Sequence, residues 1–284
     1  MTRILACTDG SVYAESIIDH AAWAAQRLAG ASVQVLHVLA REPAAALVDR
    51  SGALGLDRSD ELLRELAALD EARGKVTLRR GRAILDSAEA RLRAAGIGQV
   101  SVSLRNGALV DTVVEMEAEA DLLVIGKRGE AANFATGHLG ANLERVLRAS
   151  PRPVLVTARA FRPITRCAIA YDGGPTALRM VEFAARSPLL EGIETQLLTV
   201  APAGAAGPAL LETPAALLER AGRQVRRVVL HGDTEQAIAA HVKAAEIELL
   251  VMGAYGHSRI RTLMLGSTTS ELLRACRIPV LVYR

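Results

Sequence analysis

Residues 251–273 read VMGAYGHSRIRTLMLGSTTSELL, which is an apolar strand pattern, a glycine-containing loop and a helical pattern. Gly253 and Gly256 frame a turn, and nine residues separate Gly256 from Gly266. A glycine lets a ligand approach the backbone because no Cβ is in the way. The N–H groups and the dipole at the start of a helix favour an anion. The stretch therefore suits a phosphate-bearing ligand, although a common turn followed by a capped helix is the simpler structural interpretation.

The stretch belongs to the second of two copies of one pattern. Each copy begins with an apolar run ending in Asp-Gly, continues to a second apolar run ending in Gly, and closes with Pro-Val-Leu-Val. Landmarks that recur in the same order indicate a tandem duplication. We therefore expect two domains, at residues 1–160 and 161–284. The matched segments are 3–11 with 166–174, 121–126 with 248–253, and 153–156 with 279–282.

The two copies differ in length near their middle. Asp9 and Gly126 are 117 positions apart, whereas Asp172 and Gly253 are 81 apart. The additional residues fall in a charged helical stretch at about 40–95. We interpret this stretch as a longer solvated helix with an amphipathic face, and an interaction lid is the alternative.

Short β-type runs alternate with helical patterns in both copies. The runs lack strict apolar–polar alternation, as expected for strands that are buried on both faces of a parallel sheet. Helical stretches between them supply the crossovers. The fold class is therefore α/β, with two tandem open five-stranded parallel, Rossmann-like sheets. The expected strands are 4–8, 32–39, 100–105, 122–126 and 154–157 in the first copy, and 168–172, 195–200, 224–230, 249–253 and 280–283 in the second.

Three residues of the second copy, Asp172, Val200 and Gly253, lie at the carboxyl ends of expected strands. Ligands of open parallel sheets bind beyond these ends, where the crossovers diverge to opposite faces. If the strand order reverses between the first and fourth strands, Asp172 and Gly253 flank one crevice. The segment 266–268 then opens a helix beside it and adds hydroxyl donors.

The second copy resembles the universal stress protein family. The hallmark of that family is Gly-x2-Gly-x9-Gly-(Ser/Thr) after the fourth strand, together with an Asp that ends the first. Gly253, Gly256, Gly266 and Ser267 fit this pattern without a gap, and Asp172 fits the acidic position. The resemblance extends over nearly the whole chain as two tandem copies.

The resemblance implies an adenine nucleotide α-hydrolase-like fold that binds ATP, with Mg²⁺, between the first and fourth strands. In ATP-binding members, the acidic residue and the backbone that ends the second strand hold the adenosine side. Asp172 and Val200 would have these roles here. The glycine loop with Ser267 and Thr268 would hold the ribose and phosphates.

The glycine loop of the first copy departs from the pattern. Ten residues, instead of nine, separate Gly129 from Gly140. Ala141 stands where the motif has a hydroxyl, and Asn142 is a possible substitute as a helix cap. Gly126 retains its place at the end of the expected fourth strand. The first copy is therefore an altered site whose capacity for nucleotide is open.

Charged residues also mark the altered copy. Asp9 keeps the acidic position of the first strand, and Lys127 and Arg128 follow the strand-end glycine. The two basic side chains either offset phosphate charge or are solvated loop residues. Asp9, Gly126, Gly129, Gly140 and Asn142 together form the candidate first-half site.

Composition narrows the class of protein. The net charge is only +3, with a sequence pI of about 9.0, and aromatic residues are 3% of the 284. This balance argues against a dedicated nucleic-acid binder. Three scattered cysteines indicate neither a disulfide framework nor a metal pair. No signal-peptide pattern or long apolar run is present, so we expect a cytoplasmic protein without a membrane span.

Catalytic machinery is not evident in the sequence. There is no Walker motif, the six histidines form no metal-ligand spacing, and no nucleophile lies beside a base. His257, within the proposed loop, either touches a phosphate or is a surface histidine. We expect an ATP-binding stress or signalling protein that acts through nucleotide-dependent conformation or partner binding. The alternatives are a slow ATPase or phosphotransferase, with weak hydrolysis or autophosphorylation at most, and a scaffold with vestigial pockets.

The closing strands predict an assembly. Both Pro-Val-Leu-Val segments read as apolar edge strands, which are usually paired or covered. Members of the family that the chain resembles commonly dimerise through this strand. The resemblance therefore implies a pseudo-dimer within one chain, with a further homodimer and an unknown protein partner possible, and coverage by loops is the alternative.

Overall fold

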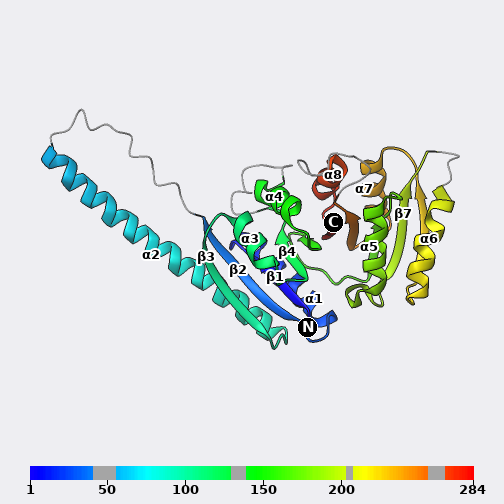
Figure 1. The fold of residues 1–284 in the computed structure, drawn as a ribbon, viewed down its shortest axis with the longest axis horizontal. Coiled ribbons are helices and arrows are strands. Elements are labelled where there is room, and N and C mark those ends of the chain that lie inside the picture. Colours follow the sequence, from blue (N-terminus) through cyan, green and yellow to red (C-terminus); the bar gives the residue numbers. More distant parts are fainter. Residues whose placement is uncertain (41–55, 129–138, 203–206, 255–265) are drawn as a thin grey trace.

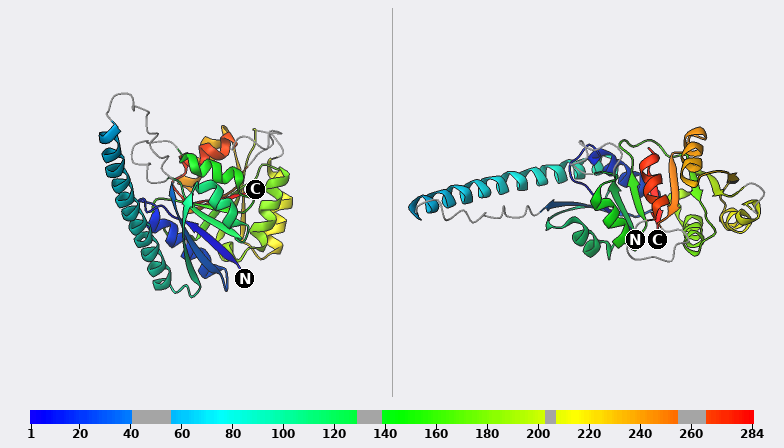
Figure 2. Two further views of the ribbon diagram at one scale, coloured as in Figure 1. Left: turned by 60° about the vertical axis from the view of Figure 1, so that its left-hand side comes forward. Right: turned by 90° about the horizontal axis from the view of Figure 1, so that it is seen from above.

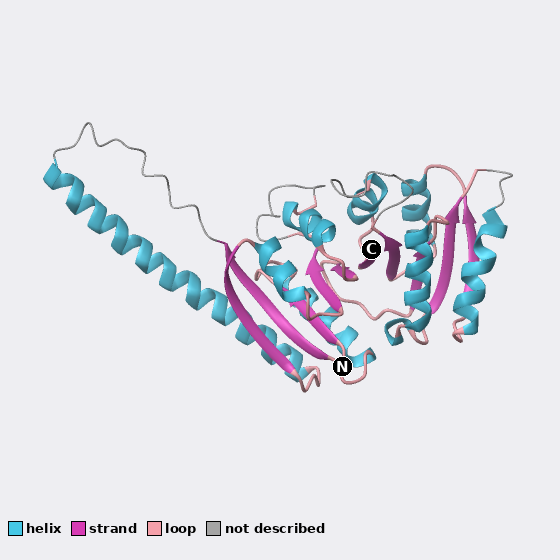
Figure 3. Cartoon of the chain, in the orientation of Figure 1, coloured by secondary structure: helices cyan, strands magenta, loops and turns pink. Residues whose placement is uncertain are grey.

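The computed structural model describes residues 1–40, 56–128, 139–202, 207–254 and 266–284. Ten strands form one continuous sheet in the order β3-β2-β1-β4-β5-β10-β9-β6-β7-β8 (Figures 1 and 3). All neighbouring strands are parallel except β5 and β10, which are antiparallel. Each half contributes five strands in the same relative order, so the expected pair of open α/β sheets is confirmed.

The first half contains β1 (Arg3–Cys7), α1 (Ala14–Arg27), β2 (Ser32–Ala40), α2 (Leu56–Ala94), β3 (Val100–Gly107), α3 (Leu109–Glu117), β4 (Leu122–Gly126), α4 (Ala141–Ala149) and β5 (Val154–Thr157). The second half contains β6 (Arg166–Ala170), α5 (Pro175–Arg186), the 3₁₀ turn η2 (Pro188–Leu190), β7 (Glu194–Val200), α6 (Gly207–Arg220), β8 (Val225–Leu230), α7 (Thr234–Ala244), β9 (Leu249–Gly253), α8 (Ser267–Ala275) and β10 (Val280–Tyr283). The first strand of the second half ends at Ala170, so Asp172 lies in the following turn instead of ending the strand.

Both faces of the sheet are buried, which explains the absence of alternation in the strand sequences. In β9, Leu249 and Val251 point into a core beneath α1, α2, α5 and α6, whereas Leu250 and Met252 point into a core beneath α3, α4, α7 and α8. Each core includes residues from both halves. Full burial of one such side chain contributes about 1.5–3 kcal/mol.

The two halves join at the seam, the antiparallel pair β5–β10. Val156 pairs with Val280, and Leu155 pairs with Leu281, both of which are completely buried. The guanidinium of Arg274 on α8 lies 3.6 Å from the carboxylate of Glu144 on α4. The seam confirms the predicted pairing of the closing strands within one chain.

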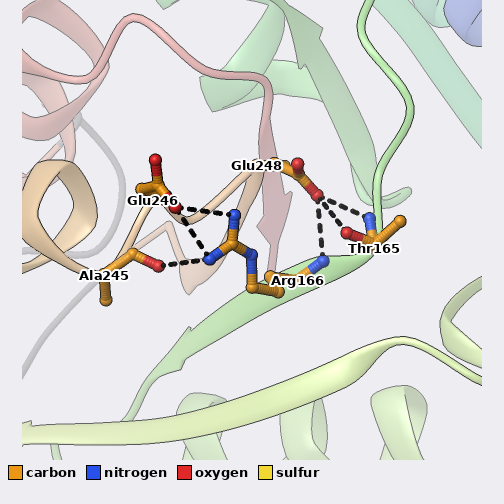
Figure 4. Close-up of polar contacts among 5 residues, drawn as sticks. All are labelled: Thr165, Arg166, Ala245, Glu246 and Glu248. Atoms are coloured by element: carbon orange, nitrogen blue, oxygen red, sulfur yellow. Dashed lines mark hydrogen bonds and ion pairs between the residues drawn. The ribbon is translucent and has the colours of Figure 1, made fainter.

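Acidic residues fix the starts of the central strands. Glu248, just before β9, accepts hydrogen bonds from the Thr165 and Arg166 amides at 2.6 and 3.1 Å, and from the Thr165 hydroxyl at 2.8 Å (Figure 4). Burial raises the pKa of Glu248, but these hydrogen bonds outweigh burial and hold the pKa below its usual value. In the first half, Asp121 likewise accepts from the Arg3 amide at 2.8 Å. The acidic landmark of the repeat therefore aligns the first and fourth strands of each half.

The insertion of the first half forms α2, a helix of 39 residues. Its C-terminal part packs on β2 and β3, and its N-terminal part extends beyond the edge of the sheet (Figures 1 and 2). A Cβ at Gly81 would lie 2.9 Å from Leu104 Cδ1 and 3.1 Å from His37 Cδ2. Glycine therefore allows α2 to lie against these strands. Within the described residues, no helix is both long and apolar enough to span a membrane.

We predict that Gly81→Leu lowers the free energy of unfolding by about 1–3 kcal/mol, because the new side chain overfills the contact between α2 and the sheet. Gly74→Leu is the matched control, since no atom lies within 4 Å of a Cβ at that position. The control should lose no stability, because leucine favours a helix more than glycine does. Urea unfolding measures both, and an equal effect of the two substitutions would contradict this packing.

Candidate functional site

The predicted site lies where β6 and β9 end beside each other. These strands are parallel neighbours, with Ala168 opposite Leu250 and Ile169 opposite Val251. The strand order reverses between them because β7 continues on one side and β10 on the other. Asp172, Val200 and Gly253 consequently share one edge of the sheet, as expected for a ligand site at a topological switch point.

Asp172 organises the turn that leads from β6 into α5. Its Oδ1 accepts a hydrogen bond from the Gly174 amide at 2.8 Å, and Gly173 between them has a φ of +79°. Asp9 does the same in the first half, accepting from the Ser11 amide at 3.0 Å around Gly10, whose φ is +72°. Both Asp-Gly pairs therefore form the turns that the sequence indicated. Asp172 is exposed at this turn.

The helix α8 begins directly after Gly266. The Thr269 hydroxyl, on the first turn, donates to the backbone oxygen of Ala254 at 3.0 Å. This contact holds the start of α8 against the end of β9. The sequence motif did not single out Thr269, and the run of hydroxyl residues after Gly266 was its only signal. The first backbone amides of α8 therefore lie beside the switch point.

Thr268 contacts a side chain that the sequence did not indicate. Its hydroxyl donates to Glu235 Oε1, on the first turn of α7, at 2.7 Å. Ser267 is exposed, whereas Thr268 is half-buried. The structure therefore adds a carboxylate at the start of α8. Glu235 lies 33 positions before Thr268 and outside the glycine motif, so only the packing of α7 on α8 reveals it.

The corresponding region of the first half differs in detail. Gly140 is the N-cap of α4 and no side chain caps this helix, so Asn142, its second residue, does not have the predicted capping role. A Cβ at Gly126 would lie 3.1 Å from Tyr13 Cβ and 3.2 Å from Ile17 Cδ1. The end of β4 is therefore tightly packed against α1 and the residue before it.

Lys127 does not face solvent at the end of β4. Its ammonium donates to the backbone oxygen of Cys276 and, at 2.9 Å, to that of Ile278. Only 8% of the residue is exposed. Burial lowers the pKa of Lys127 from 10.5 to about 8, with the Cys276 thiol opposing this shift and Arg128 adding to it. Lys127 therefore has neither of its predicted roles: it does not offset phosphate charge, and it is not a solvated loop residue. Its side chain instead caps the C-terminal end of α8 across the seam.

Histidines in the described part of the chain have structural partners or lie away from the switch point. His241 Nε2 lies 2.7 Å from Gln196 Oε1, and His231 Nδ1 lies 2.7 Å from the Ala201 oxygen. No group of three His, Cys, Asp or Glu side chains in that part could hold a metal ion. Gly129, Gly256 and His257 lie outside the described residues.

A cavity of about 500 Å³ lies elsewhere, between the two halves. Phe183 on α5 and Tyr283 on β10 line it, together with Leu122 and Leu189. It contains none of the residues of the predicted nucleotide site. The strand ends and the start of α8 meet at the switch point, which is therefore the candidate site. The cavity lies at the contact between the two halves.

Comparison with known proteins identifies relatives over the full chain. The model of the universal stress protein family matches residues 1–158 and 163–284. A universal stress protein of Synechocystis sp. is 40% identical over 288 residues, which cover 100% of both chains. One of Mycobacterium tuberculosis is 30% identical over 196 residues, covering 62% of this chain and 65% of the relative.

Solved structures share the fold. A universal stress protein from Archaeoglobus fulgidus has a TM-score of 0.70 at 22% identity, covering 99% of this chain and 96% of that chain. A putative universal stress protein from Pseudomonas aeruginosa has a TM-score of 0.60 at 15% identity, covering 100% and 93%. At these identities the similarity shows the fold alone.

We predict that Lys127→Met removes a pH dependence of stability. Between about pH 8 and pH 10.5 the unfolded chain holds the lysine proton while the folded chain has lost it, so the free energy of unfolding of the wild type rises with pH across this window. The rise relative to the variant should approach about 3 kcal/mol, at 1.36 kcal/mol per pKa unit.

Urea unfolding from pH 7 to about pH 10.5 measures this difference. Lys243→Met, which replaces an exposed lysine on α7, is the matched control and should follow the wild type. Parallel pH profiles for the wild type and Lys127→Met would show that Lys127 is not buried across the seam.

Proposed function

Because this chain belongs to the universal stress protein family, as a tandem member with both halves matched, we propose that its second half binds ATP. We propose further that the bound nucleotide shifts conformation or partner choice in a stress response or signalling pathway of the cytoplasm. The observation that carries the proposal is the start of α8 beside the switch point, at the end of an intact glycine motif.

The contacts of the second half suit the two ends of the nucleotide. Asp172 and the backbone at Val200 would hold the adenosine, since Asp172 follows β6 and Val200 ends β7, both at the edge where the switch point lies. Gly253, Gly256 and Gly266 would let the phosphates approach the backbone. The first amides of α8 then stabilise the negative charge with the Ser267 hydroxyl as a further donor. The Thr268 hydroxyl would donate to phosphate in place of Glu235.

Mg²⁺ suits the oxygen donors at the start of α8. Glu235, which accepts the Thr268 hydroxyl, supplies a carboxylate of the kind that Mg²⁺ takes together with substrate phosphates. In the bound state the cation would offset the repulsion between Glu235 and the phosphates. Asp172 is another carboxylate on this edge of the sheet.

The first half is proposed to bind nucleotide more weakly than the second. Gly126 is closely packed by Tyr13 and Ile17, and Lys127 is committed to carbonyl groups of the other half. Ala141 replaces a hydroxyl donor. These features reduce the donors and the space available to a phosphate there.

We expect calorimetric titration with ATP and Mg²⁺ to give about one nucleotide per chain. Gly266→Gln should weaken binding at least about tenfold, or about 1.4 kcal/mol, because the new side chain occupies the phosphate approach. The fold itself accommodates this change: the φ of Gly266 is −54°, and a Cβ there meets its nearest atoms at 3.6 Å.

Gly140→Gln, at the matching position of the first half, is the control and should retain wild-type affinity. A stoichiometry of two, with both variants weakened, would mean that the first half also binds. No binding at all would leave a scaffold with vestigial pockets. Steady ADP formation in the same samples would indicate the slow ATPase instead of a purely binding role.

A further inference from the structure

The outer part of α2, residues 64–80, buries no side chain. Every residue of this segment is exposed, and it extends away from the sheet in all views (Figures 1 and 2). Nine large hydrophobic side chains are exposed in the described residues, and four of them lie here. The four are Leu66 (39% exposed), Leu69 (65%), Val76 (57%) and Leu78 (36%).

Three of these side chains share one side of the helix. At 100° per residue, Leu66, Leu69 and Val76 fall within a narrow stripe, and Leu78 lies on the opposite side. The spacing of three and seven residues is that of a coiled-coil seam. A helical segment whose side chains are all exposed gains little stability from packing in water, so an apolar stripe along it favours a partner helix.

The charges of the same segment are separated along its length. Residues 64–71 contain three acidic side chains, Glu65, Asp70 and Glu71, and one basic side chain, Arg64. Residues 73–82 contain five basic side chains and no acidic one, namely Arg73, Lys75, Arg79, Arg80 and Arg82. Two such helices attract each other when antiparallel, since acidic parts then face basic parts. A parallel pair would place like charges together.

The apolar closing strands are already paired within the chain. β5 and β10 pair with each other in the middle of the sheet, and the outer edges are β3 and β8. The closing strands are therefore not available for self-association. A two-fold pairing of α2 uses the same patch on both copies and closes at a dimer.

We propose that a second copy of this chain docks antiparallel on α2, with Leu66 of each copy packed near Val76 of the other. The contact covers a segment of about 25 Å, at 1.5 Å per residue. Such a small area supports a weak dimer. Because part of the attraction is between exposed charges, the dimer should weaken with salt.

Sedimentation velocity of the full chain, from about 1 µM to about 100 µM, tests the proposal over the range of weak association. The 30.1 kDa monomer should convert to a dimer as concentration rises, less readily in 1 M salt. The combined variant Leu66→Ser, Leu69→Ser, Val76→Ser should remain monomeric. Leu78→Ser, on the opposite side of α2, is the matched control and should dimerise as the wild type does.

Circular dichroism of the combined variant checks that the rest of the chain is folded, because α2 beyond Gly81 is held by the sheet. A wild type that stays monomeric across the range would overturn the proposal. A combined variant that dimerises as the wild type does would overturn it equally.

Cross-linking tests the direction of the pair. The native cysteines are all buried, so an introduced surface cysteine is the accessible thiol. Oxidation of a mixture of Leu66→Cys and Val76→Cys chains should yield cross-linked dimers that contain one of each. Leu66→Cys alone should cross-link poorly, because the two thiols lie about 15 Å apart in an antiparallel pair. Efficient cross-linking of Leu66→Cys with itself would indicate a parallel pair and contradict the proposal.

Discussion

The antiparallel pairing of β5 with β10 is the interaction on which the rest of the structure depends. Each half alone would end its sheet in a short, mostly apolar strand, which is an edge that soluble proteins pair or cover. Pairing these strands buries Leu155 and Leu281 completely and merges the cores of the two halves on both faces. Because the pair is antiparallel, the carboxyl edge of one sheet lies beside the amino edge of the other. The two candidate sites therefore open at opposite edges of one sheet.

Duplication at such a seam lets the two copies diverge. The second half has Ala254 after its strand-end glycine, whereas the first half has Lys127. Lys127 binds carbonyl groups just beyond α8, so a residue of the first glycine turn now supports the helix that begins the second site. An ammonium at the C-terminal end of a helix is favourable to the helix dipole. The altered first half thus contacts the half that keeps the intact motif, while burial opposes the charged form of Lys127.

The insertion in the first half adds a different surface. Gly81 allows α2 to lie close to the edge of the sheet, and the part of the helix before Gly81 extends beyond the sheet. This surface is an exposed helix with an apolar stripe and separated charges, and it is a different type of contact surface from the paired strands of the seam. The seam consists of buried strands that pair through their backbones, whereas the outer part of α2 offers exposed side chains. One chain therefore combines an internal strand pairing with an external helical surface.

The sequence by itself determined the duplication, the parallel sheets and the intact glycine motif, whereas the reversal of strand order at the site was a condition that the sheet topology fulfils. The first three depend on hydrophobic periodicity and local turn chemistry, which neighbouring residues encode. Only the tertiary structure decided that Lys127 is buried, that Thr268 contacts Glu235 and that Thr269 holds α8 to β9. The partners of Lys127 lie about 150 positions away in the chain, and those of Thr268 and Thr269 lie 33 and 15 positions away. Packing brings such groups together, and no local pattern records which buried carbonyl or carboxylate a side chain will meet.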